Sequence, residues 1–174
     1  MSALVDDHPY RKRIEEALGA RDPLAVLWET PRLLGDIVRG HTAAELRARP
    51  FQGKWTVNEI VGHLSDAEWA WGWRMRLVLG QQRPALAGFD QEAWVAAQAH
   101  NQREPGELLE MFAALRCFNL ALWRRIAAQD LNRVGVHAER GAETLGQMLR
   151  LHAGHDLLHL DQITRYLAAV TSGA

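Results

Sequence analysis

The sequence predicts an all-α protein folded as a four-helix bundle. Three observations support this prediction. Apolar residues recur at helical spacing in four long segments, several of these segments begin with residues that cap helices, and β-branched residues nowhere alternate as they do in a strand. With 174 residues, the chain can bury a sizeable core in one domain. We therefore expect a single domain over residues 1–174, with residues 1–21 as an N-terminal extension.

The first long helix is expected to begin after Asp22, because a helix-capping residue is followed there by a proline at the first helical position. Leucine, isoleucine and valine then recur every three or four residues up to Gly40. Pro31 lies inside this run and predicts a kink or a break. The stretch from Thr42 to Pro50 opens with a capping box and predicts a short extra helix.

The second long helix is expected over about residues 57–79. Thr56 and Glu59 form the clearest capping box of the chain, and a glycine follows the helix. At about 100° per residue, His63 and Arg74 lie on the same stripe as several apolar residues. His63 is therefore expected to face the core.

A connection of about 25 residues follows, which exceeds the usual length of links between helices. It can cross the whole bundle, and it is expected to contain a short helix capped by Asp90. A third long helix should run from Pro105 to near Gln129, where leucines and phenylalanines keep helical spacing. The next loop, residues 132–143, carries two glycines and one histidine. We expect no strand in either connection.

The last helix is expected to start at Leu145, because Thr144 and Gln147 have the spacing of a capping box, and to run almost to the end of the chain. One stripe of this helix, about 80° wide, combines apolar residues with four polar ones. The polar residues of the stripe are His152, His155, His159 and Gln162. All four are expected to point into the interior.

Buried imidazoles need a hydrogen bond or a metal ion. His155 and His159 stand four residues apart, which places their Cβ atoms about 5–6 Å from each other and allows both rings to bind one ion. His152 with His155 is a second pair that the geometry permits. Two hydrogen-bonded core histidines are the alternative to a metal site. A third ligand from another segment would favour the metal, and His63 is a candidate.

Composition excludes several classes of function. The net charge of −1 and a total of two lysines offer no basic surface for nucleic acid. No apolar run approaches the roughly 20 residues that cross a bilayer, and the charged N-terminus is unlike a signal peptide. We expect a cytoplasmic protein without nucleic-acid or membrane partners. The single cysteine, Cys117, excludes an internal disulfide and a cysteine-ligated zinc site, and its apolar neighbours suggest a buried thiol.

Two segments resemble the DinB/YfiT-like family of metalloenzymes. The segment from Gly53 to Leu64 is similar to the one around the family's first metal ligand, and the segment from His155 to Ile163 is similar to its paired-ligand motif. The resemblance implies a four-helix bundle with a long crossover connection between helices 2 and 3, often assembled as a homodimer. It also implies a divalent metal, zinc or nickel. The implied metal ligands are His63, His155 and His159.

The resemblance also suggests an activity. Characterised members of the family are thiol-dependent S-transferases and isomerases, and others have been labelled hydrolases. We expect an S-transferase acting on a small electrophile, with a low-molecular-weight thiol as cosubstrate. Three imidazoles leave a coordination position open, as in catalytic sites, so water or a thiolate at the metal would be the reacting group, with no catalytic side chain assigned. The alternatives are a metal-dependent hydrolase, a non-catalytic metal- or ligand-binding stress-response bundle, and a purely structural dimeric bundle.

Five further residues are expected around the site. Gln162 and Asp156 would support the ligands through hydrogen bonds, and His152 would lie in the pocket or behind a ligand. By the resemblance, His137 sits in a loop that could close over the site, although an exposed loop histidine is equally compatible. Arg74 could bind an anionic substrate, or it could extend to the surface.

Overall fold

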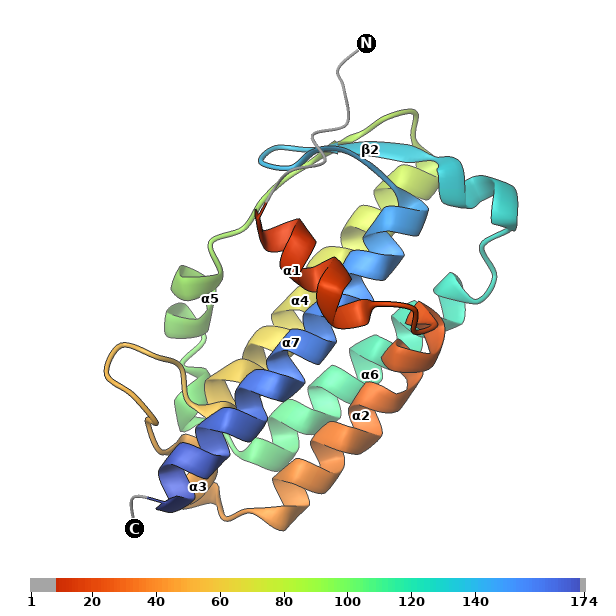
Figure 1. Ribbon diagram of the computed structural model, residues 1–174. Coiled ribbons are helices and arrows are strands. Elements are labelled where there is room, and N and C mark those ends of the chain that lie inside the picture. The colour runs from red at the N-terminus through yellow and green to blue at the C-terminus, as the bar shows by residue number, and fades with distance from the viewer. Residues whose placement is uncertain (1–8, 173–174) are drawn as a thin grey trace.

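The computed structural model describes residues 9–172 and shows a four-helix bundle (Figure 1). Its long helices pack in a ring in which α2 and α4 each contact both α6 and α7. This arrangement confirms the predicted fold class. The bundle helices are α2 (Pro23–Gly40), α4 (Val57–Gly80), α6 (Pro105–Trp123) and α7 (Leu145–Ser172).

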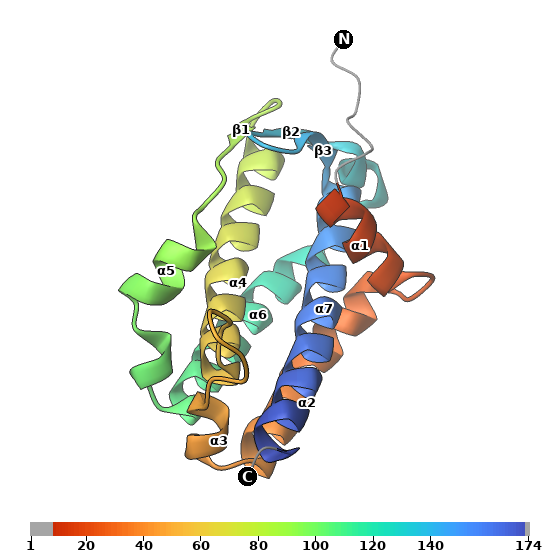
Figure 2. The ribbon, with the colours of Figure 1, turned by 60° about the vertical axis from the view of Figure 1, so that its left-hand side comes forward.

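The long crossover connection between α4 and α6 is also confirmed. It contains β1 (Ala85–Leu86), the short helix α5 (Gln91–Ala97) and the 3₁₀ turn η1 (His100–Gln102). Figure 2 shows α5 on the outer side of α4. The expected short helix before α4 is α3 (Ala43–Arg47).

The predicted helix starts are borne out by hydrogen bonds. Thr56 and Glu59 form both bonds of the capping box at α4, and Thr144 and Gln147 exchange bonds of 2.9 and 3.1 Å at α7. Because these caps satisfy the first backbone donors, they fix where the helices that carry the histidines begin.

Pro31 does not break α2, so a predicted break there is wrong. A proline has no N–H to bond the carbonyl four residues earlier, which here belongs to Leu27. That carbonyl accepts a hydrogen bond of 2.8 Å from NH1 of Arg116 on α6. The lost helical bond is thus replaced by a bond between helices, and the helix continues.

The expectation of no strand is wrong as well. Strand β1 pairs in parallel with β2 (Val134–His137), which pairs antiparallel with β3 (Gly141–Thr144). Strands of two to four residues are too short to show an alternating pattern. The small sheet lies at one end of the bundle and joins the crossover connection to the loop before α7 (Figure 2).

The N-terminal part that the structure describes forms the helix α1 (Pro9–Leu18), which packs on α7 (Figure 1). Ile14 and Leu18 are buried in this contact. Gly154 allows the close approach, since a Cβ atom there would overlap with the backbone of Ile14. The first eight residues of the expected extension lie outside the described residues.

Smaller corrections concern α6 and its surroundings. The helix ends at Trp123 instead of near Gln129, and the 3₁₀ segment η2 (Ala128–Asn132) follows it. Cys117 is exposed, not buried. Among residues 9–172, no helix is both long and apolar enough to span a bilayer.

The core consists of two apolar clusters stacked along the bundle. One is built from buried side chains within residues 67–78 of α4 and 145–153 of α7, and the other from buried side chains within residues 57–64 of α4 and 163–167 of α7. The histidines of α7 fall mainly between these two ranges, so the candidate site lies where the clusters meet.

Candidate metal centre

Three imidazoles from two helices converge on one point. Nε2 of His155 on α7 lies 3.1 Å from Nε2 of His63 on α4 and 3.1 Å from Nε2 of His159. The ligand atoms of the three residues all lie within 4.8 Å of one another. His63 and His155 are almost fully buried, while His159 is partly buried.

A hydrogen bond fixes the tautomer of His159. Its Nδ1 is 2.9 Å from Oε1 of Gln162, whose Nε2 donates to the hydroxyl of Tyr166 at 3.0 Å. Because an amide oxygen only accepts, Nδ1 of His159 carries the proton, and Nε2 offers a lone pair to the other two rings. Gln162 thus supports a candidate ligand, as expected from the sequence.

The three rings cannot satisfy one another by hydrogen bonds alone. In a neutral imidazole, Nε2 of His155 either carries a proton or has a lone pair. It can therefore donate one hydrogen bond, to His159 or to His63, or accept one from His63, but it cannot bond both neighbours. Nδ1 of His63 and Nδ1 of His155 are buried and have no hydrogen-bond partner among the described residues. A cation between the three Nε2 atoms would accept all three lone pairs, so the residues present fit a metal ion.

The environment keeps these histidines neutral. Burial lowers the pKa of His63 and His155 well below the ordinary value, and the neighbouring imidazoles lower it further. Burial also lowers the pKa of His159 to about 4, although the bond to Gln162 acts in the opposite direction. At neutral pH the three rings therefore retain the lone pairs that metal binding requires.

His152 takes no part in this cluster. Its Nε2 lies 2.5 Å from Oε1 of Glu68, and its ring stacks on Trp71 with 5.5 Å between centroids. Both Glu68 and Asp156 pair with Arg116, and all of these side chains are buried. Asp156 was expected to support the ligands through hydrogen bonds and His152 to lie in the pocket or behind a ligand. The structure places both in an ion-pair network beside the histidine cluster, and His152 is not among the residues that line the adjacent cavity.

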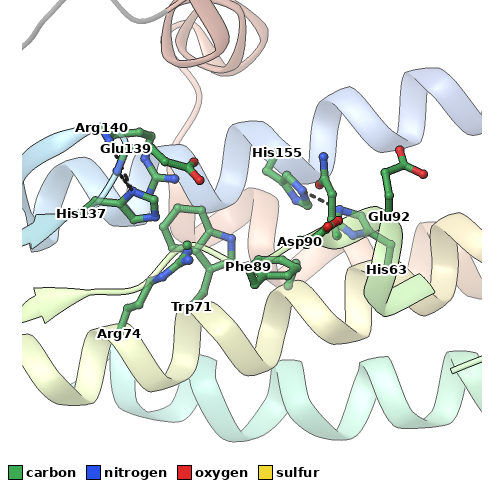
Figure 3. Close-up of a pocket in the computed structure, with 13 residues that line it drawn as sticks. His63, Trp71, Arg74, Phe89, Asp90, Glu92, His137, Glu139, Arg140 and His155 are labelled. Atoms are coloured by element: carbon green, nitrogen blue, oxygen red, sulfur yellow. Dashed lines mark hydrogen bonds between the residues drawn. The ribbon is translucent and has the colours of Figure 1, made fainter. Parts of the chain in front are cut away.

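A cavity of about 400 Å³ opens beside His63 and His155 (Figure 3). Its walls come from α4, from the crossover connection and from the turn between β2 and β3. Nε1 of Trp55 donates to Glu92 at 2.8 Å and so holds the crossover near His63. The volume is in the range of small-molecule sites.

Two predicted residues, Arg74 and His137, line this cavity. Arg74 is 4% exposed and so does not extend to the surface. His137 is buried at the end of β2, where its Nδ1 accepts from the backbone N–H of Glu139 at 3.2 Å and of Arg140 at 3.4 Å. His137 is therefore not an exposed loop histidine.

The sequence did not reveal several residues of the cavity and the network. Trp71, Phe89 and Arg140 line the cavity, and Glu68 and Arg116 form the network. The one available signal was a charged residue on the apolar stripe of a helix, as with Arg116, which stands four residues after Phe112 and four before Leu120 in α6. Arg140 became a wall residue only through the hairpin, whose strands are too short to predict.

Comparisons with known proteins agree with this architecture. Residues 27–163 match the sequence profile of the DinB superfamily. The chain is 28% identical over 146 residues to YfiT of Bacillus subtilis, covering 82% of each protein. It is also 28% identical over 137 residues to OB0782 of Oceanobacillus iheyensis, covering 78% of each. Both relatives carry the provisional name of a metal-dependent hydrolase.

A solved structure of Bacillus subtilis YfiT, described as a probable metal-dependent hydrolase with an unusual four-helix bundle topology, superposes with a TM-score of 0.77. The superposition covers 95% of this chain and 91% of that chain at 24% identity, and it confirms the fold. Because the family profile spans most of the chain, the protein belongs to the DinB superfamily, as its two histidine segments suggested.

Proposed function

We propose that this protein is a metal-dependent hydrolase of small molecules whose divalent metal ion is held by His63, His155 and His159. The observation that carries the proposal is the convergence of three Nε2 atoms, from rings kept neutral by burial, beside a cavity. The provisional names of two relatives, YfiT and OB0782, point to the same class. Three protein ligands are typical of catalytic sites, because a fourth position stays open.

Each part of the chain has a defined task in this proposal. When bound, a divalent ion supplies Lewis acidity and makes a nucleophile available from water at neutral pH. Gln162 orients the ring of His159 through Nδ1, as the outer partners of metal-binding histidines do. Trp71 and Phe89 give the cavity an apolar wall on which the body of a small substrate can pack.

The hydrolase is preferred over the S-transferase expected from the sequence. The names of the relatives refer to hydrolases and do not mention a thiol. Thiol-dependent transfer therefore stays a prediction, and so does the choice between zinc and nickel, since imidazole ligands suit several transition metals.

Metal analysis of the untagged protein tests the centre. The wild type should contain about one zinc or nickel ion per chain, and His63→Ala, His155→Ala and His159→Ala should each lose most of it. His137→Ala and His152→Gln serve as controls, and the glutamine can still donate to Glu68. If His152→Gln empties the site while His159→Ala does not, the proposed ligand set is wrong.

An activity screen tests the chemistry. The metal-loaded protein would be assayed against esters, amides and lactones in the absence of thiol, and against small electrophiles with added cysteine as the thiol. Hydrolysis without thiol that disappears in His159→Ala supports the proposal. Turnover only with thiol would favour a transferase, and retained metal without any turnover would favour a binding protein.

A further inference from the structure

The wall of the cavity around Trp71 carries two buried guanidinium groups. Arg74 on α4 is 4% exposed, and Arg140 in the turn between β2 and β3 is 9% exposed. The Cζ atom of each lies 5.6 Å from the centre of the Trp71 ring. Figure 3 shows both side chains beside this tryptophan, while His63 lies at the other end of the view.

Both guanidinium groups are held in place by protein acceptors. Nε and NH2 of Arg74 donate to the carbonyl oxygen of Ala87 at 3.2 and 2.6 Å. Nε and NH2 of Arg140 donate to the two carboxylate oxygens of Glu143, which is fully buried. The orientation of each group is therefore set before any ligand enters, which reduces the entropic cost of binding.

One edge of Arg140 is left for a ligand. The ion pair with Glu143 uses Nε and NH2, and NH1 donates to none of the described residues. Arg140 lines the cavity. Its NH1 has no partner among the described residues and is still not a fully buried atom, so this edge is exposed at the cavity wall. A guanidinium presents such an edge readily to a carboxylate.

Acidic residues of the cavity lie mainly elsewhere. Asp90 caps α5 through Ala93, and Glu92 accepts from Trp55. Figure 3 shows both near His63. Glu139 is the acidic residue beside Arg140, and it is exposed to solvent. One end of the cavity therefore holds the two buried guanidinium groups, of which Arg140 is paired with Glu143, and the other end combines the histidines with two carboxylates.

We propose that Arg74 and Arg140 form a subsite for a carboxylate group of the substrate. This inference rests on the proposed hydrolase function, because it places the bond to be cleaved at the histidine end. The ring of Trp71 lies against both guanidinium groups and forms an apolar floor for the part of the substrate between the two ends. The substrate class is a small carboxylic acid that carries a hydrolysable group on an apolar body.

Calorimetric titration with phenylacetate and with its neutral analogue phenylacetamide tests the subsite on the zinc-supplemented full-length protein. Phenylacetate should bind more tightly, and Arg74→Met should weaken it by about tenfold to a hundredfold, as expected for loss of a cation beside the carboxylate. Arg140→Lys should also weaken binding, while its charge still pairs with Glu143. Arg76→Met is the matched control on α4, since Arg76 contacts Asn119 and Phe118 outside the cavity.

His159→Ala separates the two proposals, because His159 does not line the cavity. Phenylacetate binding that survives in this variant but falls in Arg74→Met supports the subsite even if no hydrolysis is found. Binding that vanishes in His159→Ala and is unchanged in the arginine variants would place the carboxylate at the metal and overturn the subsite. Equal affinity for phenylacetate and phenylacetamide in the wild type, or binding of neither, would overturn it without any variant.

Discussion

His152 and His155 lie one turn apart on α7, and both reach α4, but they meet different partners there. Nε2 of His155 faces His63 at 3.1 Å, whereas Nε2 of His152 faces the carboxylate of Glu68 at 2.5 Å. Two adjacent contacts of this kind fix the register of α7 against α4. The ion-pair network around Glu68 therefore also determines whether His63 meets its partners.

Arg116 connects all four helices of the bundle. From α6 it binds the carbonyl of Leu27 on α2, Glu68 on α4 and Asp156 on α7. Burial alone would raise the pKa of Glu68, but the charges of His152 and Arg116 outweigh burial and hold it below its ordinary value. Glu68 is thus an ionised carboxylate that faces the guanidinium of Arg116 in the interior.

Arg116→Met should lower the free energy of unfolding by about 3–5 kcal/mol, because it leaves two carboxylates without their cation. Chemical denaturation of the metal-free protein measures this change. Arg165→Met is the control, since Arg165 forms an exposed pair with Asp161 on α7 and should change stability little. Adding Glu68→Gln and Asp156→Asn to Arg116→Met should restore part of the loss. No recovery would mean that uncompensated charge is not the cause.

Gln162→Ala should weaken zinc binding by roughly tenfold to a hundredfold, because Nδ1 of His159 loses the acceptor that orients its ring. Competition with a chromogenic chelator measures the affinity. Tyr166→Phe should have a smaller effect, as it removes only the hydroxyl that holds Gln162. Thr164→Ala, exposed on the same helix, is the control. Unchanged affinity in Gln162→Ala would contradict the role given to this contact.

The sequence predicted the bundle well because its signals are local. A capping box and the apolar spacing that follows it depend on residues within one helix. The structure shows the helix starts that were predicted from Thr56 and Thr144. Whether a proline interrupts a helix depends on more distant residues. Pro31 lacks a helical bond, but the replacement comes from Arg116, 85 positions further along the chain, and no local pattern contains this information.

The candidate site was predictable to the same extent. Helical periodicity placed His152, His155 and His159 on one stripe, which the structure confirms, but it could not show which of them meets His63. His152 does not meet His63 because its Nε2 is bonded to the carboxylate of Glu68 on α4. The arginines of the cavity depend on the small sheet, whose strands give no sequence pattern.

The metal-free protein should lose stability as the pH falls below about 6.5, the ordinary pKa of a histidine. The pKa values of His63, His155 and His159 are lowered in the folded state, so the unfolded chain binds more protons in this range. Stability is fully present above about pH 6.5 and declines as the pH falls toward the folded pKa values, by up to about 1.4 kcal/mol per pH unit for each proton.

Urea unfolding after treatment with a chelator, at about pH 7, 6 and 5, measures this decline. In His155→Met, the slope of the free energy of unfolding against pH should be smaller by up to the contribution of one proton, about 1.4 kcal/mol per pH unit. Glu68 contributes to the loss of stability only at lower pH, because its pKa is lowered in the folded state and its carboxylate takes up a proton only below its ordinary pKa. A stability that stays constant or rises between pH 7 and pH 5 would contradict neutral histidines in the folded state.

Gly62→Ala should destabilise the protein by about 1–3 kcal/mol, because a Cβ atom there would overlap with the imidazole of His100. His100 is fully buried and cannot move easily, since its Nε2 bonds Asp66 at 2.9 Å. Displacing His100 would shift the crossover connection that carries the cavity wall.

The control is Gly80→Ala at the end of the same helix, where no atom lies within 4 Å of the added Cβ. This change should stabilise the protein by about 0.4–1 kcal/mol, because it restricts the unfolded chain. Thermal and chemical unfolding of both variants would measure the difference. If Gly62→Ala were as stable as Gly80→Ala, His100 would not pack against α4, and the wall that the crossover builds beside His63 would lose its anchor.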